Sequence, residues 1–258
     1  MKQRALLVGL GGIGWRLPAP LETHYQAIKQ HAHIDFAGGV DTSDDARREF
    51  QQATGALVYA DLASALTDAQ PSIVTIATPP STHADLVCQA AAHPSVKGIV
   101  CEKPMAESVA DCRRMIAACA DKALLIGHQR RYEQRHRLLR AFLRSEALGR
   151  PVAGVCRFSG GYLNNGTHAA DAMRFLLDDG PWRIEQADGD TFAAWISTEH
   201  GSVGLHSRGN MEPGYLKAMY NDLLECMDSG KAPECSGDDG LEAVRLALIA
   251  QDAKENAA

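Results

Sequence analysis

The chain has 258 residues, of which 45% are hydrophobic and 22% charged, and its formal net charge is -6. This acidic balance argues against a general affinity for nucleic acid, and no apolar stretch approaches the roughly 20 residues of a membrane span. The seven cysteines are scattered without a C-x-x-C pair, which predicts reduced thiols, a cytoplasmic location and no metal site.

Short apolar runs alternate with helical patterns over the first half of the chain. Strands are expected at 5–10, 34–41, 72–78, 97–103 and 123–128, and helices at 21–31, 44–54, 60–68, 83–93 and 108–121. Strands that alternate with helices predict an α/β domain with a doubly wound parallel sheet. The apolar runs contain few polar residues, as expected of strands buried on both faces. This domain is expected to span residues 1–127.

The pattern changes near residue 128. A basic amphipathic helix is expected at 134–149, strands at 151–160, 183–189, 190–198 and 202–210, and closing helices at 214–230 and 240–256. Gly230 is a plausible C-terminal cap for the first closing helix. Residues 128–258 are therefore expected to form a smaller α+β domain with an open, mainly antiparallel sheet.

A glycine-rich turn follows the first expected strand. Gly9, Gly11 and Gly14 spell G-x-G-x-x-G, the pattern that lets a backbone approach the pyrophosphate of a dinucleotide in a Rossmann fold. We therefore take Gly9, Gly11, Gly12, Ile13 and Gly14 as candidate cofactor-binding residues. The alternative is that these glycines form only a tight structural turn.

The seven residues WRLPAPL, 15–21, interrupt the helix that normally opens from such a turn, because they include two prolines. We interpret this stretch as an insertion, so that the helix begins near Leu21. Trp15 and Arg16 could cover the cofactor or be loop residues with no role.

Asp41 ends the second expected strand, 27 residues after Gly14. Removal of the insertion restores the usual spacing of an acid that binds the ribose hydroxyls. A carboxylate repels a 2′-phosphate, so Asp41 favours NAD. NADP is still possible, since Arg47 and Arg48 could counter that charge, although they also fit the solvated face of a helix.

Four further stretches occur in a fixed order: IATPPSTHADLVCQAA (76–91), VCEKPMAES (100–108), GHQRRYEQ (127–134) and GGYLNNGTHAADAMRFLL (160–177). Together with the glycine turn they resemble the glucose–fructose oxidoreductase / inositol dehydrogenase / MocA (Gfo/Idh/MocA) family over nearly the whole chain. The resemblance implies a Rossmann domain joined to an α+β domain, with the substrate between them over the nicotinamide. It also implies an NAD(P)-dependent oxidoreductase acting on a sugar, polyol, cyclitol or sugar derivative.

The resemblance makes Lys103 and His168 the catalytic residues. A lysine beside the reacting oxygen can polarise it and help to move its proton. A histidine with an ordinary pKa near ~6.5 suits proton exchange at neutral pH. The alternatives are a surface lysine before a proline and a structural histidine on a helix.

The cofactor pocket has further residues implied by the same resemblance. Thr78, Pro79 and His83 are expected to form one of its walls, although His83 could simply start its helix. Glu102 is expected either to position the lysine or to bind the nicotinamide ribose.

Asn164 stands where inositol-dehydrogenase-like members carry an aspartate, four residues before His168. An amide can orient a substrate hydroxyl but cannot tune the histidine with a negative charge, so the chain departs from the inositol pattern. Asp171 could cap or anchor the same helix.

Arg130 and Tyr132 are implied substrate contacts, because this region lines the substrate cleft or the domain junction in the family. One arginine could hold a polar or phosphorylated substrate. Either Arg130 or Arg131 could instead form a salt bridge between the domains.

The 131 residues from 128 onward form a shorter second domain than the family usually has. We expect the exposed face of its sheet to pair with another subunit and make a homo-oligomer. A non-catalytic NAD(P)-binding regulator is the alternative function, and glycoside cleavage with tightly held NAD is a third.

Overall fold

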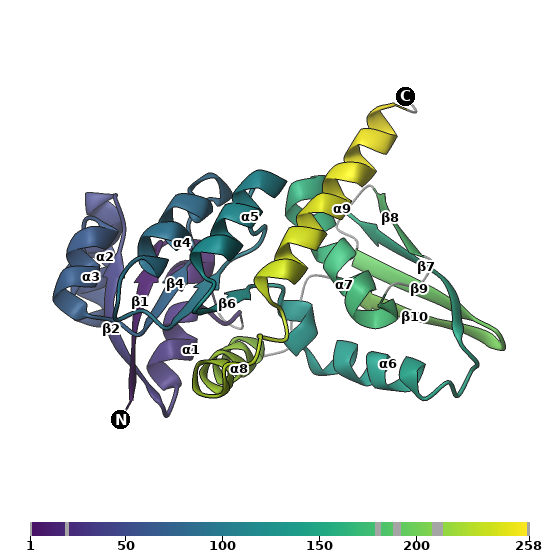
Figure 1. Ribbon diagram of the computed structural model, residues 1–258, viewed down its shortest axis with the longest axis horizontal. Helices are drawn as coiled ribbons and strands as arrows, with labels where there is room; N and C mark the ends of the chain where they lie inside the picture. The colour runs from purple at the N-terminus through teal and green to yellow at the C-terminus, as the bar shows by residue number, and fades with distance from the viewer. Residues whose placement is uncertain (1, 19–20, 179–181, 188–191, 208–213, 257–258) are drawn as a thin grey trace.

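The computed structural model describes residues 2–18, 21–178, 182–187, 192–207 and 214–256. Two lobes lie side by side, one around a six-stranded sheet and the other around a four-stranded sheet (Figure 1). Helix α9 (Gly237–Glu255) runs along the boundary between them and contacts helices of both. Among the described residues, none of the helices combines the length and apolar composition that crossing a bilayer requires.

The six-stranded sheet is parallel throughout, with strand order β3-β2-β1-β4-β5-β6. Its strands are β1 (Gln3–Val8), β2 (Ile34–Val40), β3 (Val58–Tyr59), β4 (Ile73–Ile76), β5 (Gly98–Cys101) and β6 (Ala123–Ile126). This order confirms the expected doubly wound Rossmann-type sheet, whose direction of winding reverses between β1 and β4. Strand β3 escaped sequence analysis, because two residues are too few to show a pattern.

Helices cover both faces of this sheet: α1 (His24–Gln30), α2 (Asp44–Thr54), α3 (Leu62–Ala69), α4 (His83–Ala91) and α5 (Val109–Ala118). Several begin at a side-chain cap, since Thr23, Ser43, Asp61 and Ser108 each accept a backbone N–H of the first turn. The cap at Thr23 places the start of α1 at His24, three residues after the start expected near Leu21.

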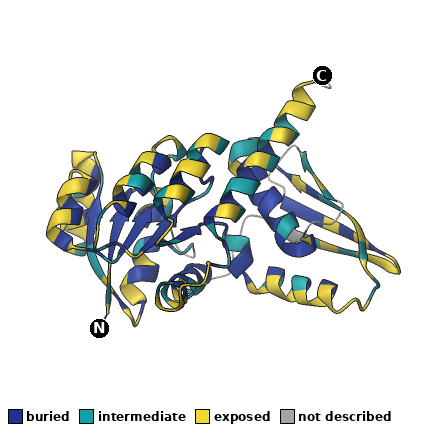
Figure 2. Cartoon of the chain, viewed as in Figure 1, coloured by how far each residue is buried: buried dark blue, intermediate teal, exposed yellow. Residues whose placement is uncertain are grey.

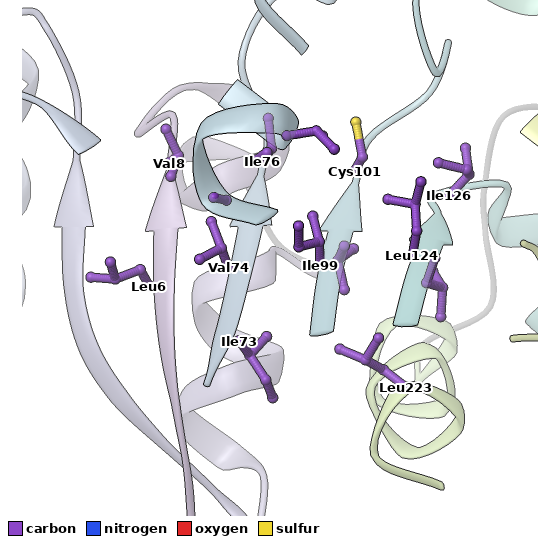
Figure 3. Close-up of a cluster of buried hydrophobic side chains, with 14 of the residues drawn as sticks. Leu6, Val8, Ile73, Val74, Ile76, Ile99, Cys101, Leu124, Ile126 and Leu223 are labelled. Carbon is purple, nitrogen blue, oxygen red and sulfur yellow. The ribbon is translucent and has the colours of Figure 1, made fainter. Parts of the chain in front are cut away.

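The core of this lobe is formed by side chains of its central strands and of the helices that cover them. Figure 3 shows a group of these side chains on β1, β4, β5 and β6, with Leu223 reaching them from a helix near the end of the chain. That helix is α8 (Tyr215–Ser229), which ends at Gly230 in the left-handed conformation, as expected of a cap. Leu216, Met219, Tyr220 and Leu223 of α8 are fully buried in this core. The six-stranded lobe thus takes one of its covering helices from the C-terminal half.

The second sheet has strand order β10-β9-β7-β8. Its strands are β7 (Pro151–Phe158), β8 (Trp182–Gln186), β9 (Phe192–Thr198) and β10 (Gly201–Ser207). Strand β7 pairs with β9 in antiparallel and with β8 in parallel orientation, and β9 and β10 are antiparallel. The expected open, mainly antiparallel sheet is confirmed.

Two helices of this lobe, α6 (Gln134–Arg144) and α7 (Thr167–Leu177), contribute to its core. Figure 2 shows that α7 is buried along its length whereas α6 exposes its outer face. Helix α6 is shorter than the expected 134–149, because the backbone turns at Glu146 and Gly149, both with positive φ.

Candidate active site

A cavity of about 640 Å³ opens at the carboxyl ends of β1, β2 and β4. Its lining includes five of the residues singled out from the sequence: Gly9, Gly11, Asp41, Thr78 and Pro79. This is the point where the winding of the sheet reverses, which is where doubly wound sheets bind their ligands. The volume falls within the range of small-molecule and cofactor sites.

The glycine turn is compact on its inner side and open on its outer side. A Cβ on Gly9, whose φ is +96°, would lie 2.5 Å from the carbonyl oxygen of Ala77, and a Cβ on Gly14 would lie 2.2 Å from that of Gly9. A Cβ on Gly11 would meet no atom within 4 Å. The turn therefore needs glycine for its own packing and offers an uncovered backbone to a ligand.

One π-helical turn, Gly12–Arg16, stands in place of the usual long helix after the glycine turn and includes Ile13. The Trp15 ring meets the Phe50 ring edge-on, with centroids 5.2 Å apart, and Arg16 forms an ion pair with Glu49. These contacts join the inserted stretch to α2.

Asp41 is held firmly at the edge of the cavity. Its Oδ2 accepts the Leu10 N–H and its Oδ1 accepts the Ser43 N–H, both at 2.9 Å. Arg47 donates to the backbone oxygen of Asp41 over 2.6 Å, while Arg48 pairs with Asp45. Both arginines are thus engaged on α2 or its cap, and the carboxylate keeps a fixed orientation.

His83 lies behind the wall of this cavity. Its Nε2 is 2.8 Å from the carbonyl oxygen of Thr78, and its Nδ1 is 3.0 Å from that of Pro104. The fully buried ring therefore links the loop after β4 to the loop that carries Lys103.

The structure brings Lys103 and Asn164 together, although 61 residues separate them. Lys103 follows β5, and its Nζ donates a hydrogen bond of 2.6 Å to Oδ1 of Asn164. Asn164 belongs to the π-helical turn Tyr162–Gly166, directly before α7. Burial and the charge of Arg130 lower the pKa of Lys103, and Glu102 opposes them. The lysine is thus held across the boundary between the lobes.

His168 lies in the first turn of α7, with its ring almost fully buried. Its Nδ1 has no hydrogen-bond partner among the described residues. Burial, followed by Lys103 and Arg130, lowers the pKa of His168 well below its ordinary value of 6.5. Lys103 thus lies close enough to His168, the second predicted catalytic residue, for its charge to act on the ring.

A third histidine, which the sequence did not single out, stands beside His168. The His128 ring is perpendicular to it, with centroids 5.5 Å apart, and both His128 nitrogens are buried without a partner among the described residues. Burial lowers the pKa of His128 as well. Its position two residues after β6, at the carboxyl edge of the sheet, is the signal that would have identified it.

Glu102 belongs to a buried hydrogen-bond chain. Its Oε1 is 2.9 Å from His24 Nε2, and the other His24 nitrogen is 2.9 Å from the Tyr220 hydroxyl. Its Oε2 accepts the backbone N–H of Lys103. Burial raises the pKa of Glu102, but the hydrogen bond and charge of His24 and the charge of Lys103 outweigh it and leave the pKa lowered. Glu102 therefore fixes the backbone that carries Lys103.

The two adjacent arginines have different roles in the structure. Arg131 is buried and pairs with Asp171 at 2.8 Å and Asp239 at 3.0 Å, which joins α7 to α9. Arg130 instead lies over the Phe192 ring, with its guanidinium carbon 3.5 Å from the ring centroid. Asp171 is thus the anchor of α7, and Arg131 is the salt-bridge residue.

Tyr132 points toward α8. Its hydroxyl donates to Oδ2 of Asp222 over 2.6 Å, and burial raises the pKa of this hydroxyl. In the described part of the chain, no cluster of three or more His, Cys, Asp or Glu side chains is arranged to hold a metal ion.

Comparison with known proteins relates the six-stranded lobe to a family of oxidoreductases. A family model described as an oxidoreductase family with an NAD-binding Rossmann fold matches residues 3–128. A D-apiose dehydrogenase of Rhizobium rhizogenes is 34% identical over 125 residues, which cover 47% of this chain and 36% of that protein. An inositol 2-dehydrogenase of Rubrobacter xylanophilus is 26% identical over 207 residues, which cover 74% and 55%. The chain thus spans less than two thirds of the length of these relatives.

Solved structures extend the likeness of fold over the whole chain. The structure of GenD2 from gentamicin A biosynthesis in complex with NAD superposes with a TM-score of 0.84 at 16% identity, over 100% of this chain and 95% of that one. A myo-inositol dehydrogenase from Corynebacterium glutamicum superposes with a TM-score of 0.80 at 16% identity, over 98% and 96%. Both lobes therefore have the fold of these proteins.

Proposed function

Because the chain belongs to the Gfo/Idh/MocA oxidoreductase family, with an NAD-binding Rossmann fold over residues 3–128, we propose that it oxidises or reduces the CH–OH carbon of a carbohydrate-like substrate. The curated relatives named as D-apiose and inositol dehydrogenases support a sugar or cyclitol derivative. The observation that carries the proposal is the Lys103–Asn164 hydrogen bond beside the buried His168.

The residues present fit the cofactor. The open backbone at Gly11 would hold the pyrophosphate, and the fixed carboxylate of Asp41 would accept the ribose hydroxyls. Thr78 and Pro79 would line the route toward Lys103. NAD, when bound, supplies the acceptor for the hydride.

Lys103 and His168 divide the handling of the hydroxyl proton in this proposal. Asn164 holds the Lys103 ammonium in place, so that Nζ can polarise the oxygen of the reacting hydroxyl. His168 is neutral at pH 7 because its pKa is lowered, and it can accept the hydroxyl proton as a general base. In the reverse direction the same ring returns the proton to the forming alcohol.

The test is turnover of a panel of sugars, polyols and cyclitols, followed by the absorbance of NADH. Lys103→Ala should lower kcat by about 10²–10⁴-fold, the usual contribution of such a group, while NADH binding, followed by fluorescence, is retained. Unchanged turnover in this variant would remove Lys103 from the mechanism. Absence of turnover across the panel, with NADH still bound, would favour a non-catalytic regulator.

We also propose that the four-stranded sheet joins two copies of the chain. On the face opposite the lobe's core, Val155, Trp195 and Gly204 form one row across β7, β9 and β10. Trp195 keeps 38% of its surface exposed, and an aromatic side chain on an open sheet is a typical interface residue. Light scattering after size exclusion should give a dimer or larger assembly, and a strict monomer would contradict the proposal.

A further inference from the structure

In the part of the chain that the structure describes, Arg130 is a cation beside the catalytic pair that forms no ion pair. It lies in the short turn Gln129–Tyr132 after β6, and its Nε is buried without a hydrogen-bond partner among the described residues. Within the described chain its side chain makes no ion pair, whereas the neighbouring Arg131 pairs with two aspartates. Burial lowers the pKa of Arg130 to about 10, so the guanidinium is still charged at neutral pH.

The carboxylates that influence Arg130 are occupied by other groups. Glu133 lies 2.6 Å from Arg135 with one oxygen and 2.6 Å from His136 Nδ1 with the other. Asp171 is held by Arg131. Both acids stabilise the charge of Arg130 from a distance, but in the described chain neither forms an ion pair with it.

Arg130 adds positive potential to the catalytic pair, while Glu133 and Asp171 act on Arg130 in the opposite sense. The charges of Lys103 and Arg130 both act on His168 and lower its pKa, and Arg130 also lowers the pKa of Lys103. A half-buried cation whose Nε is shielded from water is costly in such a place unless a ligand supplies negative charge.

The aromatic contact prepares Arg130 for such a ligand. The guanidinium rests on the Phe192 ring, which restrains its plane and leaves its N–H edges for an acceptor. A planar carboxylate matches two of these N–H groups at once. A single guanidinium also matches the single charge of a carboxylate better than the nearly two charges of a phosphate ester.

We propose that Arg130 binds a carboxylate of the substrate, so that this site prefers sugar acids to neutral sugars and cyclitols. The inference rests on the proposed function, because it places the substrate beside Lys103 and His168. A neutral substrate would leave the guanidinium unpaired, whereas the carboxylate of a sugar acid would pair with it. The sugar acid should therefore bind more tightly than the neutral sugar.

The experiment compares uronates with the matching aldoses, D-glucuronate with D-glucose and D-galacturonate with D-galactose. Turnover is followed by NADH absorbance, and binding by calorimetry at saturating NADH. The variants are Arg130→Gln and Arg130→Lys, with melting temperatures to confirm folding. Arg144→Gln is the matched control, since Arg144 is exposed in the same lobe and pairs with Asp178 at the surface.

The native protein should favour the uronate of each pair at least about tenfold in kcat/KM. Arg130→Gln should lower the uronate value roughly 100-fold, as expected for the loss of a charge pair, and the aldose value far less, so that the preference for the uronate is lost. Arg130→Lys should recover only part of the loss, because an ammonium cannot bind bidentately. Arg144→Gln should match the native protein.

Equal losses on both members of a pair, or a native preference for the aldose, would overturn carboxylate recognition and leave the proposed redox function intact. If no substrate is turned over but the uronate binds in an Arg130-dependent manner, recognition stands and the redox proposal fails. Binding that is insensitive to Arg130, or tighter binding of inorganic phosphate than of uronate, would also overturn the inference.

Discussion

Lys103 and Asn164 share a hydrogen bond of 2.6 Å that joins the end of β5 to the turn before α7. One partner comes from each lobe, so this contact fixes the lysine relative to His168. The bond also places position 164 where a newly introduced charge would act directly on the ammonium group.

Asn164→Asp should raise the pKa of Lys103, since a carboxylate beside Nζ favours the ammonium form. The basic limb of the pH profile of kcat, where it reports Lys103, should move to higher pH. Asn164→Ala should instead lower kcat by about tenfold or more through loss of positioning, with little change in that limb. A profile that is identical in all three proteins would show that Asn164 does not act on Lys103.

Acidification should weaken the fold below pH 6.5. Burial is the main cause that lowers the pKa values of His168, His128 and His136 from 6.5. The pKa of His168 is lowered further by the charges of Lys103, Arg130, His128 and His136. The unfolded chain therefore binds more protons than the folded chain between 6.5 and the lowered values, so stability falls as pH falls through this window. Melting temperatures at pH 7.5 and 5.5 measure the loss. An unchanged melting temperature would mean that these rings titrate normally.

His128→Phe should leave the free energy of unfolding unchanged or raise it by about 1 kcal/mol. Both His128 nitrogens are buried without partners in the described chain, and removal of unpaired polar atoms relieves a desolvation cost. The exposed His33 provides the control His33→Phe, which should change stability little. A loss of more than about 2 kcal/mol on urea unfolding would reveal a partner that holds His128.

Substitution of the glycines should separate packing from cofactor binding. Gly9→Ala places a Cβ 2.5 Å from a backbone oxygen and should lower the melting temperature, whereas Gly11→Ala meets no atom within 4 Å. Gly11→Ala should therefore fold normally but bind NADH more weakly, since its methyl group stands where the pyrophosphate would approach. Normal NADH affinity in folded Gly11→Ala would move the pyrophosphate away from this glycine.

Local sequence patterns predicted most of the fold. The buried strands depend on neighbouring residues, so the continuous apolar runs of β1 and β4 could be recognised directly. Strand β3 was missed because it has only two residues and is defined by its pairing with β2 at the edge of the folded sheet. The early end of α6 was missed because it depends on backbone turns at Glu146 and Gly149.

The candidate site was less predictable where tertiary contacts decide a residue's role. Arg130 and Arg131 are identical in type and adjacent, and only the position of Asp171 on α7 assigns the salt bridge to the second. The chain from Glu102 through His24 to Tyr220 joins residues as much as 196 positions apart. No local pattern could have linked them.

The placement of α8 has a consequence for synthesis of the chain. Its buried face completes the hydrophobic core of the six-stranded lobe, yet more than eighty residues separate α8 from β6, the last strand of that sheet. A ribosome must therefore deliver almost the entire polypeptide before the nucleotide-type lobe can close. A fragment that stops at residue 127 should expose the apolar surface beneath Leu223 and aggregate, whereas the same fragment supplied with residues 214–230 as a separate peptide should regain solubility.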